Sequence, residues 1–335
     1  MSANKLQNQL IDGFGRVARK LRISVTDRCN MRCMYCMPSN NAEWFEQKDV
    51  LSYEEITRLA KIFAGLGIEK IRITGGEPTV RHEIEKLIGE LSKVDGIKSI
   101  SMTTNGLLLH DNVKKLKEAG LASVNVSLDT FRSDRFKAIT GIDGVGKVLA
   151  SIKAADYVGL KVKINTVVVR GWNDDEVVDF AKFAMDTGYI VRFIEFMPLD
   201  GTGMWTPDLV FSKKEIMERI NNSICKLVPL DDHGSDPEML YSIGDKGIVG
   251  FIPSITEPFC SRCDRVRITA NGRFLGCLFE HPGYDLNSLL RNGKSDGEIS
   301  KYIAECFKKK PEGIVSIIKT KSLRPAMNAM YKIGG

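Results

Sequence analysis

Six short runs rich in β-branched residues alternate with longer segments of helical spacing, and this alternation restricts the fold more than any other feature. The runs cover residues 21–26, 70–74, 99–104, 123–128, 161–169 and 190–196. Segments between them begin at residues that favour helix N-termini, such as Ser52 and Asp111. Strands and helices that alternate in this way form parallel sheets with right-handed crossovers. Because six units are too few to close an eight-stranded barrel, the pattern predicts an α/β fold with a partial, TIM-barrel-like (β/α)6 barrel.

Polar residues and glycines gather where the predicted strands end. They are Asp27 to Cys36, Gly75-Gly76-Glu77-Pro78, Asn105-Gly106, Asp129, Asn165 and Glu195 to Pro198. Glycine and asparagine often do no more than mark turns. In parallel α/β folds, however, ligands bind at the carboxyl ends of the strands. Since every predicted strand end carries such residues, the sequence favours a ligand site at this end of the barrel.

The alternation stops after about Asn221, and a different kind of chain follows. A loop-rich stretch is expected through residue 241, then short strands at 247–255, 265–270 and 273–278, with Asn271-Gly272 as a hairpin turn. Residues 285–310 are expected to be helical and to end in a solvated run of three lysines at 308–310. These changes predict two domains, residues 1–230 and 231–335.

Composition and charge limit the classes of function. With 48 basic and 42 acidic residues, the net charge of +6 suits an anionic small molecule and falls short of the basic face of a nucleic-acid binder. No apolar run approaches the roughly 20 residues of a membrane span. The eight cysteines cluster as three and three, with Cys225 and Cys306 apart, in a long chain without a signal peptide. We therefore expect a protein of the reducing cytoplasm, without a nucleic-acid or membrane partner.

The first cysteine set is Cys29, Cys33 and Cys36, with the spacing C-x3-C-x2-C. Three thiolates can hold three corners of a 4Fe–4S cluster and leave one iron open to a small molecule. Structural zinc needs four donors in closely spaced pairs, and the nearby sequence offers no fourth His or Cys. The spacing therefore favours an iron–sulfur cluster over zinc.

The second cysteine set is Cys260, Cys263 and Cys277, in which a C-x2-C pair is followed by a third cysteine after the predicted hairpin. This spacing indicates a metal site of some kind. His281 lies four residues beyond Cys277, so a Cys3His zinc site competes with a second cluster. A single histidine in a loop is usually a surface residue, and the residues alone leave both possibilities open.

Both cysteine sets lie in tracts that resemble known families. The first, with Tyr35 directly before its last cysteine, resembles the signature of the radical S-adenosylmethionine (SAM) enzymes. Residues 259–267, 271–273 and 277–279 resemble the C-terminal cluster motif of the GTP 3′,8-cyclase family, also called molybdenum cofactor biosynthesis protein A. Further matching tracts are 72–78, 103–106, 125–129, 192–197 and the final Gly334-Gly335. Met31 and Asp264 depart from the residues usual in this family, an aromatic and an asparagine, and residues 231–241 match it poorly.

The resemblance implies a 4Fe–4S cluster in each cysteine set. In the superfamily, the open iron of the first cluster binds SAM, and its electron splits SAM to give a 5′-deoxyadenosyl radical. Cys29, Cys33 and Cys36 would hold this catalytic cluster. In the family, the open iron of the second cluster binds guanine, so Cys260, Cys263 and Cys277 would be ligands and His281 would not. A C-terminal domain with this second cluster is expected to close the barrel mouth.

The resemblance also assigns ligand-binding residues. For SAM they are Tyr35, Gly76, Ser127 and Met197; for GTP they are Arg22, Arg72, Thr103, Lys163, Arg265 and Arg267. One pair has support from the pattern itself. Arg265 and Arg267 are two apart on a predicted strand and project from one face, where like charges are unfavourable unless an anion lies opposite. Guanidinium groups hold a triphosphate well.

The activity implied is conversion of GTP to (8S)-3′,8-cyclo-7,8-dihydroguanosine 5′-triphosphate, the first step of molybdenum cofactor (molybdopterin) biosynthesis. Expected partners are an external electron donor, the downstream cyclic pyranopterin monophosphate synthase and a second copy of the chain in a homodimer. A radical SAM peptide maturase with an auxiliary cluster is an alternative, although more cysteines and a peptide-recognition domain would be expected. A zinc-stabilised nucleic-acid-binding module is another, and metal analysis would distinguish it.

Overall fold

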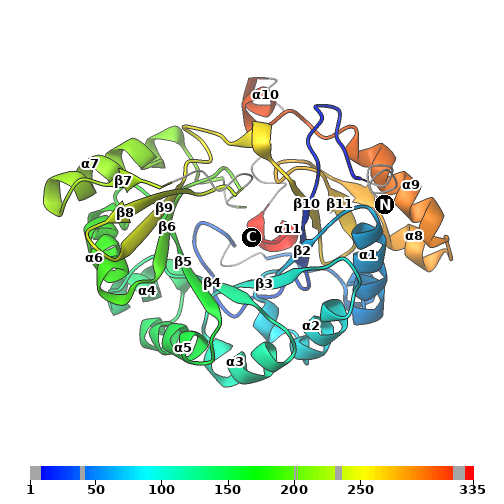
Figure 1. The fold of residues 1–335 in the computed structure, drawn as a ribbon, viewed down its shortest axis with the longest axis horizontal. Coiled ribbons are helices and arrows are strands. Elements are labelled where there is room, and N and C mark those ends of the chain that lie inside the picture. Colours follow the sequence, from blue (N-terminus) through cyan, green and yellow to red (C-terminus); the bar gives the residue numbers. More distant parts are fainter. Residues whose placement is uncertain (1–8, 38–41, 200, 202, 231–235, 320–328) are drawn as a thin grey trace.

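Six parallel strands with helices on their outer side form the body of the molecule (Figure 1). The computed structural model describes residues 9–37, 42–199, 201, 203–230, 236–319 and 329–335. The six strands are β1 (Lys20–Ser24), β2 (Lys70–Thr74), β3 (Ser99–Thr104), β4 (Ser123–Ser127), β5 (Lys161–Val168) and β6 (Ile190–Glu195). They are neighbours in sequence order, so the predicted partial barrel is confirmed.

Helices cover the outer side of these strands (Figure 1). They are α1 (Tyr53–Gly65), α2 (Ile84–Ser92), α3 (Leu109–Glu118), α4 (Ser133–Thr140), α5 (Val145–Tyr157), α6 (Val177–Thr187) and α7 (Lys213–Ser223). Ser52 begins α1 with a capping box, in which its side chain accepts from the Glu55 amide and Glu55 accepts from the Ser52 amide. Along β1, Leu21 and Ile23 are fully buried in the core, while Arg22 between them faces the barrel interior.

The C-terminal strands extend this same sheet at both of its edges. At one edge β9 (Gly247–Ile252) runs parallel to β6, followed by β8 (Met239–Ile243) and β7 (Val228–Pro229). At the other edge β10 (Arg265–Ile268) runs parallel to β1, followed by β11 (Arg273–Leu275) and β12 (Tyr284–Asp285). Both cysteine sets are thereby attached to one sheet.

One expectation for the C-terminal part needs correction, and two others are confirmed. The predicted loop through residue 241 is wrong at its end, because β8 begins at Met239 and pairs with β9. The helical expectation for residues 285–310 is confirmed by α8 (Asn287–Arg291) and α9 (Asp296–Phe307), which are followed by α10 (Ile314–Lys319) and α11 (Met330–Ile333). The hairpin at Asn271-Gly272 is confirmed by the antiparallel pairing of β10 with β11. The boundary at 230/231 stays a prediction, and residues 231–235 lie outside the described part of the chain.

Within the described ranges, no helix combines the length and the apolar character that a membrane crossing requires.

Candidate active site

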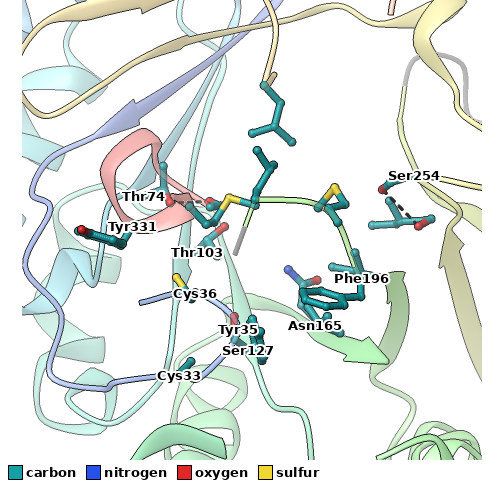
Figure 2. Close-up of a pocket in the computed structure, with 18 of the residues that line it drawn as sticks. Cys33, Tyr35, Cys36, Thr74, Thr103, Ser127, Asn165, Phe196, Ser254 and Tyr331 are labelled. Carbon is teal, nitrogen blue, oxygen red and sulfur yellow. Dashed lines mark hydrogen bonds between the residues drawn. The ribbon is translucent and has the colours of Figure 1, made fainter. Parts of the chain in front are cut away.

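A cavity of about 330 Å³ lies inside the barrel, and both cysteine sets line it. Figure 2 shows part of its wall, with Cys33 and Cys36 near Tyr35 and Ser127. All six cysteines of the two sets contribute to the wall: Cys29, Cys33, Cys36, Cys260, Cys263 and Cys277. Residues more than 220 positions apart in the sequence therefore meet at one site.

The first cysteine set lies in the loop after β1. The Cys33 carbonyl oxygen accepts from the Cys36 amide at 2.9 Å, which turns the loop back on itself. Burial raises the pKa of the Cys29 thiol to about 11 and that of Cys36 to about 12. Burial also raises the pKa of Cys33, and the neighbouring Cys36 adds to this effect. Raised pKa values disfavour three neighbouring thiolates unless a cationic group binds them, and a cluster with one iron for each cysteine fits this site.

The residues predicted to bind SAM lie on the cavity wall beside this loop. Ser127 and Met197 line the cavity at the ends of β4 and β6. Tyr35 donates a hydrogen bond from its hydroxyl to the Asp129 carboxylate and stands edge-on to Phe196, with ring centroids 6.2 Å apart. The structure therefore brings these three predicted residues together.

Gly76 also lines the cavity, and its size is a requirement of the packing. A Cβ atom at this position would lie 2.3 Å from the Arg28 carbonyl oxygen and 2.6 Å from that of Asp27. The Gly76 amide donates to the Thr26 carbonyl at 2.7 Å. The loop after β2 can approach the cysteine loop this closely because residue 76 has no side chain.

The cysteines of the second set lie before and after the hairpin that β10 and β11 form. Cys260 begins a short 3-10 helix, Cys263 follows it, and Cys277 comes just after β11. Burial raises the pKa of Cys277 to about 11. At Cys263 burial acts in the same direction, but Arg265 and Lys310 outweigh it and lower the pKa to about 6. Three thiols on one cavity wall beside cations suit a metal cluster held by thiolates.

Neither cysteine set is a preformed site for a single ion. Among the described residues, no three His, Cys, Asp or Glu side chains converge on one metal-ion position. His281, the competing zinc ligand, has an exposed side chain. The ligands of a 4Fe–4S cluster occupy separate corners of a cube and do not meet at one point.

A row of arginines crosses three neighbouring strands on the cavity wall. The strand register places Arg267 of β10 beside Arg22 of β1, and Arg22 beside Arg72 of β2. Burial is the larger cause that lowers the pKa of Arg22, and repulsion from Arg267 and Arg72 lowers it further. Burial also lowers the pKa of Arg72 and of Arg267 to about 10. Like charges at adjacent strand positions are destabilising, so this row suits a polyanionic ligand in the cavity.

The other residues predicted to bind GTP divide into two groups. Arg265 lines the cavity with its guanidinium 4.6 Å from the Phe259 ring centroid, and Thr103 lines it at the end of β3. Lys163 is not among the lining residues, and its ammonium pairs with the Glu238 carboxylate at 2.5 Å. The assignment of Lys163 to GTP stays a prediction, and Glu238 would have to release it.

Sequence reasoning missed Arg192, a further cation of the cavity wall. This β6 residue is 2% exposed, lies 3.5 Å from Glu238, and has a pKa lowered by burial. The alternation in β6 could have revealed it, because Arg192 and Ile194 share the face that points into the barrel. Its acidic neighbour, Glu238, comes from a segment more than 40 residues away and had no local signal.

The two final glycines are hydrogen-bonded to residues of the cavity wall. In Figure 1 the end of the chain lies at the centre of the barrel. Thr74 donates to the Gly335 carbonyl at 2.5 Å, and Arg267 donates to the Gly334 carbonyl at 2.6 Å. Gly334 has φ of 82°, and a Cβ there would lie 2.9 Å from the Thr74 methyl carbon. Both its conformation and its surroundings therefore require glycine.

Removal of Gly334 and Gly335 is expected to lower the yield of cyclised nucleotide by at least about tenfold. The tail makes two hydrogen bonds to the wall, and each contributes ~1 kcal/mol. A loss of ~1.4 kcal/mol corresponds to a tenfold change in rate. Product formation is measured for the shortened chain and for Lys332→Ala, whose side chain is not on the cavity wall. Full activity of the shortened chain would show that the tail only fills space.

The sequence matches two families in succession. Residues 23–184 match the Radical SAM superfamily, and residues 189–315 match the family described as Molybdenum Cofactor Synthesis C. Among solved structures, the chain is similar to Streptococcus suis SuiB bound to precursor peptide SuiA, with a TM-score of 0.60 and 17% identity. That likeness covers 97% of this chain and 77% of the other, and it supports the fold alone.

Relatives of known name cover nearly the whole chain. The GTP 3′,8-cyclase of Thermodesulfovibrio yellowstonii is 44% identical over 327 residues, which is 97% of this chain and 99% of that protein. The mitochondrial GTP 3′,8-cyclase of Arabidopsis thaliana is 41% identical over 337 residues, 99% of this chain and 85% of that protein. Since this identity extends through both matched regions, the chain belongs to the GTP 3′,8-cyclase family of radical SAM enzymes.

Proposed function

We propose that this protein converts GTP to (8S)-3′,8-cyclo-7,8-dihydroguanosine 5′-triphosphate, the first step of molybdenum cofactor biosynthesis, with two 4Fe–4S clusters. One observation carries the proposal: a single cavity is lined by two separate three-cysteine sets and by a row of arginines. Each cysteine set leaves one iron of a cluster without a protein ligand. The arginines supply positive charge where a triphosphate would lie.

The first cysteine set is the proposed reaction centre. Cys29, Cys33 and Cys36 would hold the first cluster, which would supply the electron that cleaves SAM to methionine and the 5′-deoxyadenosyl radical. That radical would abstract the ribose 3′ hydrogen, and C3′ would then attack guanine C8. A further electron, from the external donor, and a proton would reduce the resulting aminyl radical. Tyr35, Gly76, Ser127 and Met197 form the wall against which SAM would lie. These residues position SAM and exclude water, and proton transfer has little part in their role.

The second cysteine set and the arginines would position GTP. Cys260, Cys263 and Cys277 would hold the second cluster at the guanine end of the substrate. Arg22, Arg72 and Arg267 form one row of the wall and would bind the phosphates. With the nucleotide fixed at both ends, its ribose is held for reaction between them.

The proposal is tested with anaerobic, reconstituted protein. Iron and sulfide are counted, and the protein is then incubated with SAM, dithionite and GTP. We expect 5′-deoxyadenosine together with a cyclised nucleotide, and no such nucleotide when GTP is replaced by ATP. Colourless protein that contains zinc alone and binds oligonucleotides with strong salt dependence would contradict the proposal.

We further propose the partners and location that the resemblance implies. An external donor would supply the electron for SAM cleavage, and the cyclic pyranopterin monophosphate synthase would consume the product. A homodimer is expected. The eight unpaired cysteines suit the reducing cytoplasm.

Alanine in place of Arg267 is expected to weaken GTP binding by about 2 kcal/mol, or about thirtyfold, as for the loss of a charge-assisted contact. SAM affinity should change little. The measurement is GTP titration of the reconstituted protein, with Arg273→Ala as control, because Arg273 lies on the neighbouring strand and outside the cavity wall.

Arg267 also holds the tail, so the shortened chain without Gly334 and Gly335 is titrated alongside. An equal loss of affinity in both variants would mean that Arg267 acts through the tail. Unchanged affinity in Arg267→Ala would remove it from the GTP site.

A further inference from the structure

Lys310 is a buried cation beside the second cysteine set. The sequence suggested that residues 308–310 form a solvated run, but only Lys308 and Lys309 of the three are exposed, whereas Lys310 is 3% exposed. The Lys310 ammonium lies 3.5 Å from the Cys263 sulfur, 3.4 Å from the Cys263 carbonyl oxygen and 3.2 Å from the Arg265 carbonyl oxygen. The expectation for Lys310 was wrong because the chain turns inward after α9.

Within the described residues, Lys310 takes part in none of the ion pairs. The nearby Glu280 carboxylate is engaged by the Gly276 amide at 2.6 Å and the Cys277 amide at 3.3 Å. A buried ammonium that lacks a paired anion is strongly destabilising. The Cys263 sulfur is the group at hydrogen-bond distance that can carry the missing negative charge.

The segment that follows Lys310 is fixed against the same cysteine set. Arg16 donates to the carbonyl oxygens of Pro311 at 2.8 Å, Glu312 at 2.5 Å and Cys260 at 2.8 Å. A Cβ atom at Gly313 would lie 2.6 Å from the Cys260 sulfur, so the backbone passes directly over this thiol. The position of Lys310 is therefore fixed by α9 before it and by the hydrogen bonds of Arg16 to the segment after it.

We infer that Lys310 is a positioning residue for the second cluster, where its ammonium hydrogen-bonds the Cys263 sulfur and raises the reduction potential of the bound cluster. The inference rests on the proposed function, because it needs a cluster in the second cysteine set. A hydrogen bond and a positive charge at a ligand sulfur stabilise the reduced form, which carries one more electron and therefore more negative charge. Dithionite can supply that electron in the assay.

The test is an anaerobic redox titration of the complete protein followed by electron paramagnetic resonance. GTP should perturb the signal of the second cluster, and SAM that of the first. In Lys310→Gln we expect the midpoint potential of the GTP-sensitive signal to shift to a more negative value, with the SAM-sensitive signal unmoved. Lys309→Gln removes the same charge from the adjacent exposed position and should leave both potentials as in the wild type.

Lys310→Arg keeps the charge and decides the remaining outcomes. A midpoint potential close to that of the wild type in Lys310→Arg supports the inference. This holds even if Lys310→Gln loses the iron of the second site and its potential cannot be measured. Loss of that iron in both variants would assign Lys310 to packing and overturn the inference, as would an unchanged potential in Lys310→Gln. Wild-type protein with a single cluster would instead refute the proposed function.

Discussion

Alanine in place of Cys33 is expected to abolish 5′-deoxyadenosine formation and GTP turnover together, to below detection. The first cysteine set offers three thiolates, and the loss of one leaves two irons of the cluster without a protein ligand. Because SAM cleavage precedes every later step of the proposed reaction, no partial activity should remain. Chromatography of 5′-deoxyadenosine after incubation with SAM and dithionite measures the effect.

Cys225→Ala is the matched control for this experiment. Cys225 is also a half-buried free cysteine, but it does not line the cavity. Its replacement should leave both products unchanged, which excludes a general effect of removing a thiol. Normal 5′-deoxyadenosine formation by Cys33→Ala would refute the assignment of the first cluster.

The barrel could be predicted from sequence because its signals are local. Each of β1 to β6 ends within two residues of its predicted bounds, since β-branched runs, helix caps and glycines recur in the same order along the chain. The strand β8 lacked such a signal. Its residues, Met239–Ile243, contain one β-branched residue and follow Asp236 and Pro237, which favour a loop, so pairing with β9 decided its structure.

The cavity wall could be predicted where motif and strand alternation agree. Arg265 and Arg267 share a face of β10, and the structure places both on the wall. The position of Lys163 could not be predicted in this way, because it depends on an ion pair with Glu238, a partner 75 residues away. The burial of Lys310 also depends on a distant segment, since its ammonium contacts the Cys263 sulfur and the Arg265 carbonyl oxygen. Contacts between distant segments leave no periodic signal in the sequence.

Alanine in place of Cys277 is expected to leave SAM cleavage partly intact while no cyclised nucleotide forms. The two cysteine sets share no residue, so the first cluster should remain chemically competent when a ligand of the second is lost. GTP should bind more weakly, because the proposed contact to guanine is lost while the arginine row remains. The measurements are 5′-deoxyadenosine, cyclised nucleotide and iron content in the same samples.

A structural zinc site at Cys277 predicts a different outcome, because structural zinc contributes folding free energy directly. Loss of a ligand would then unfold the C-terminal strands, and the missing element would be zinc. His281→Ala distinguishes the two possibilities. The His281 side chain is exposed and should be dispensable for a three-cysteine cluster, whereas in a Cys3His site its loss would be as damaging as that of Cys277. A severe loss of metal in His281→Ala would therefore overturn the second cluster, and with it the proposed contact between that cluster and guanine.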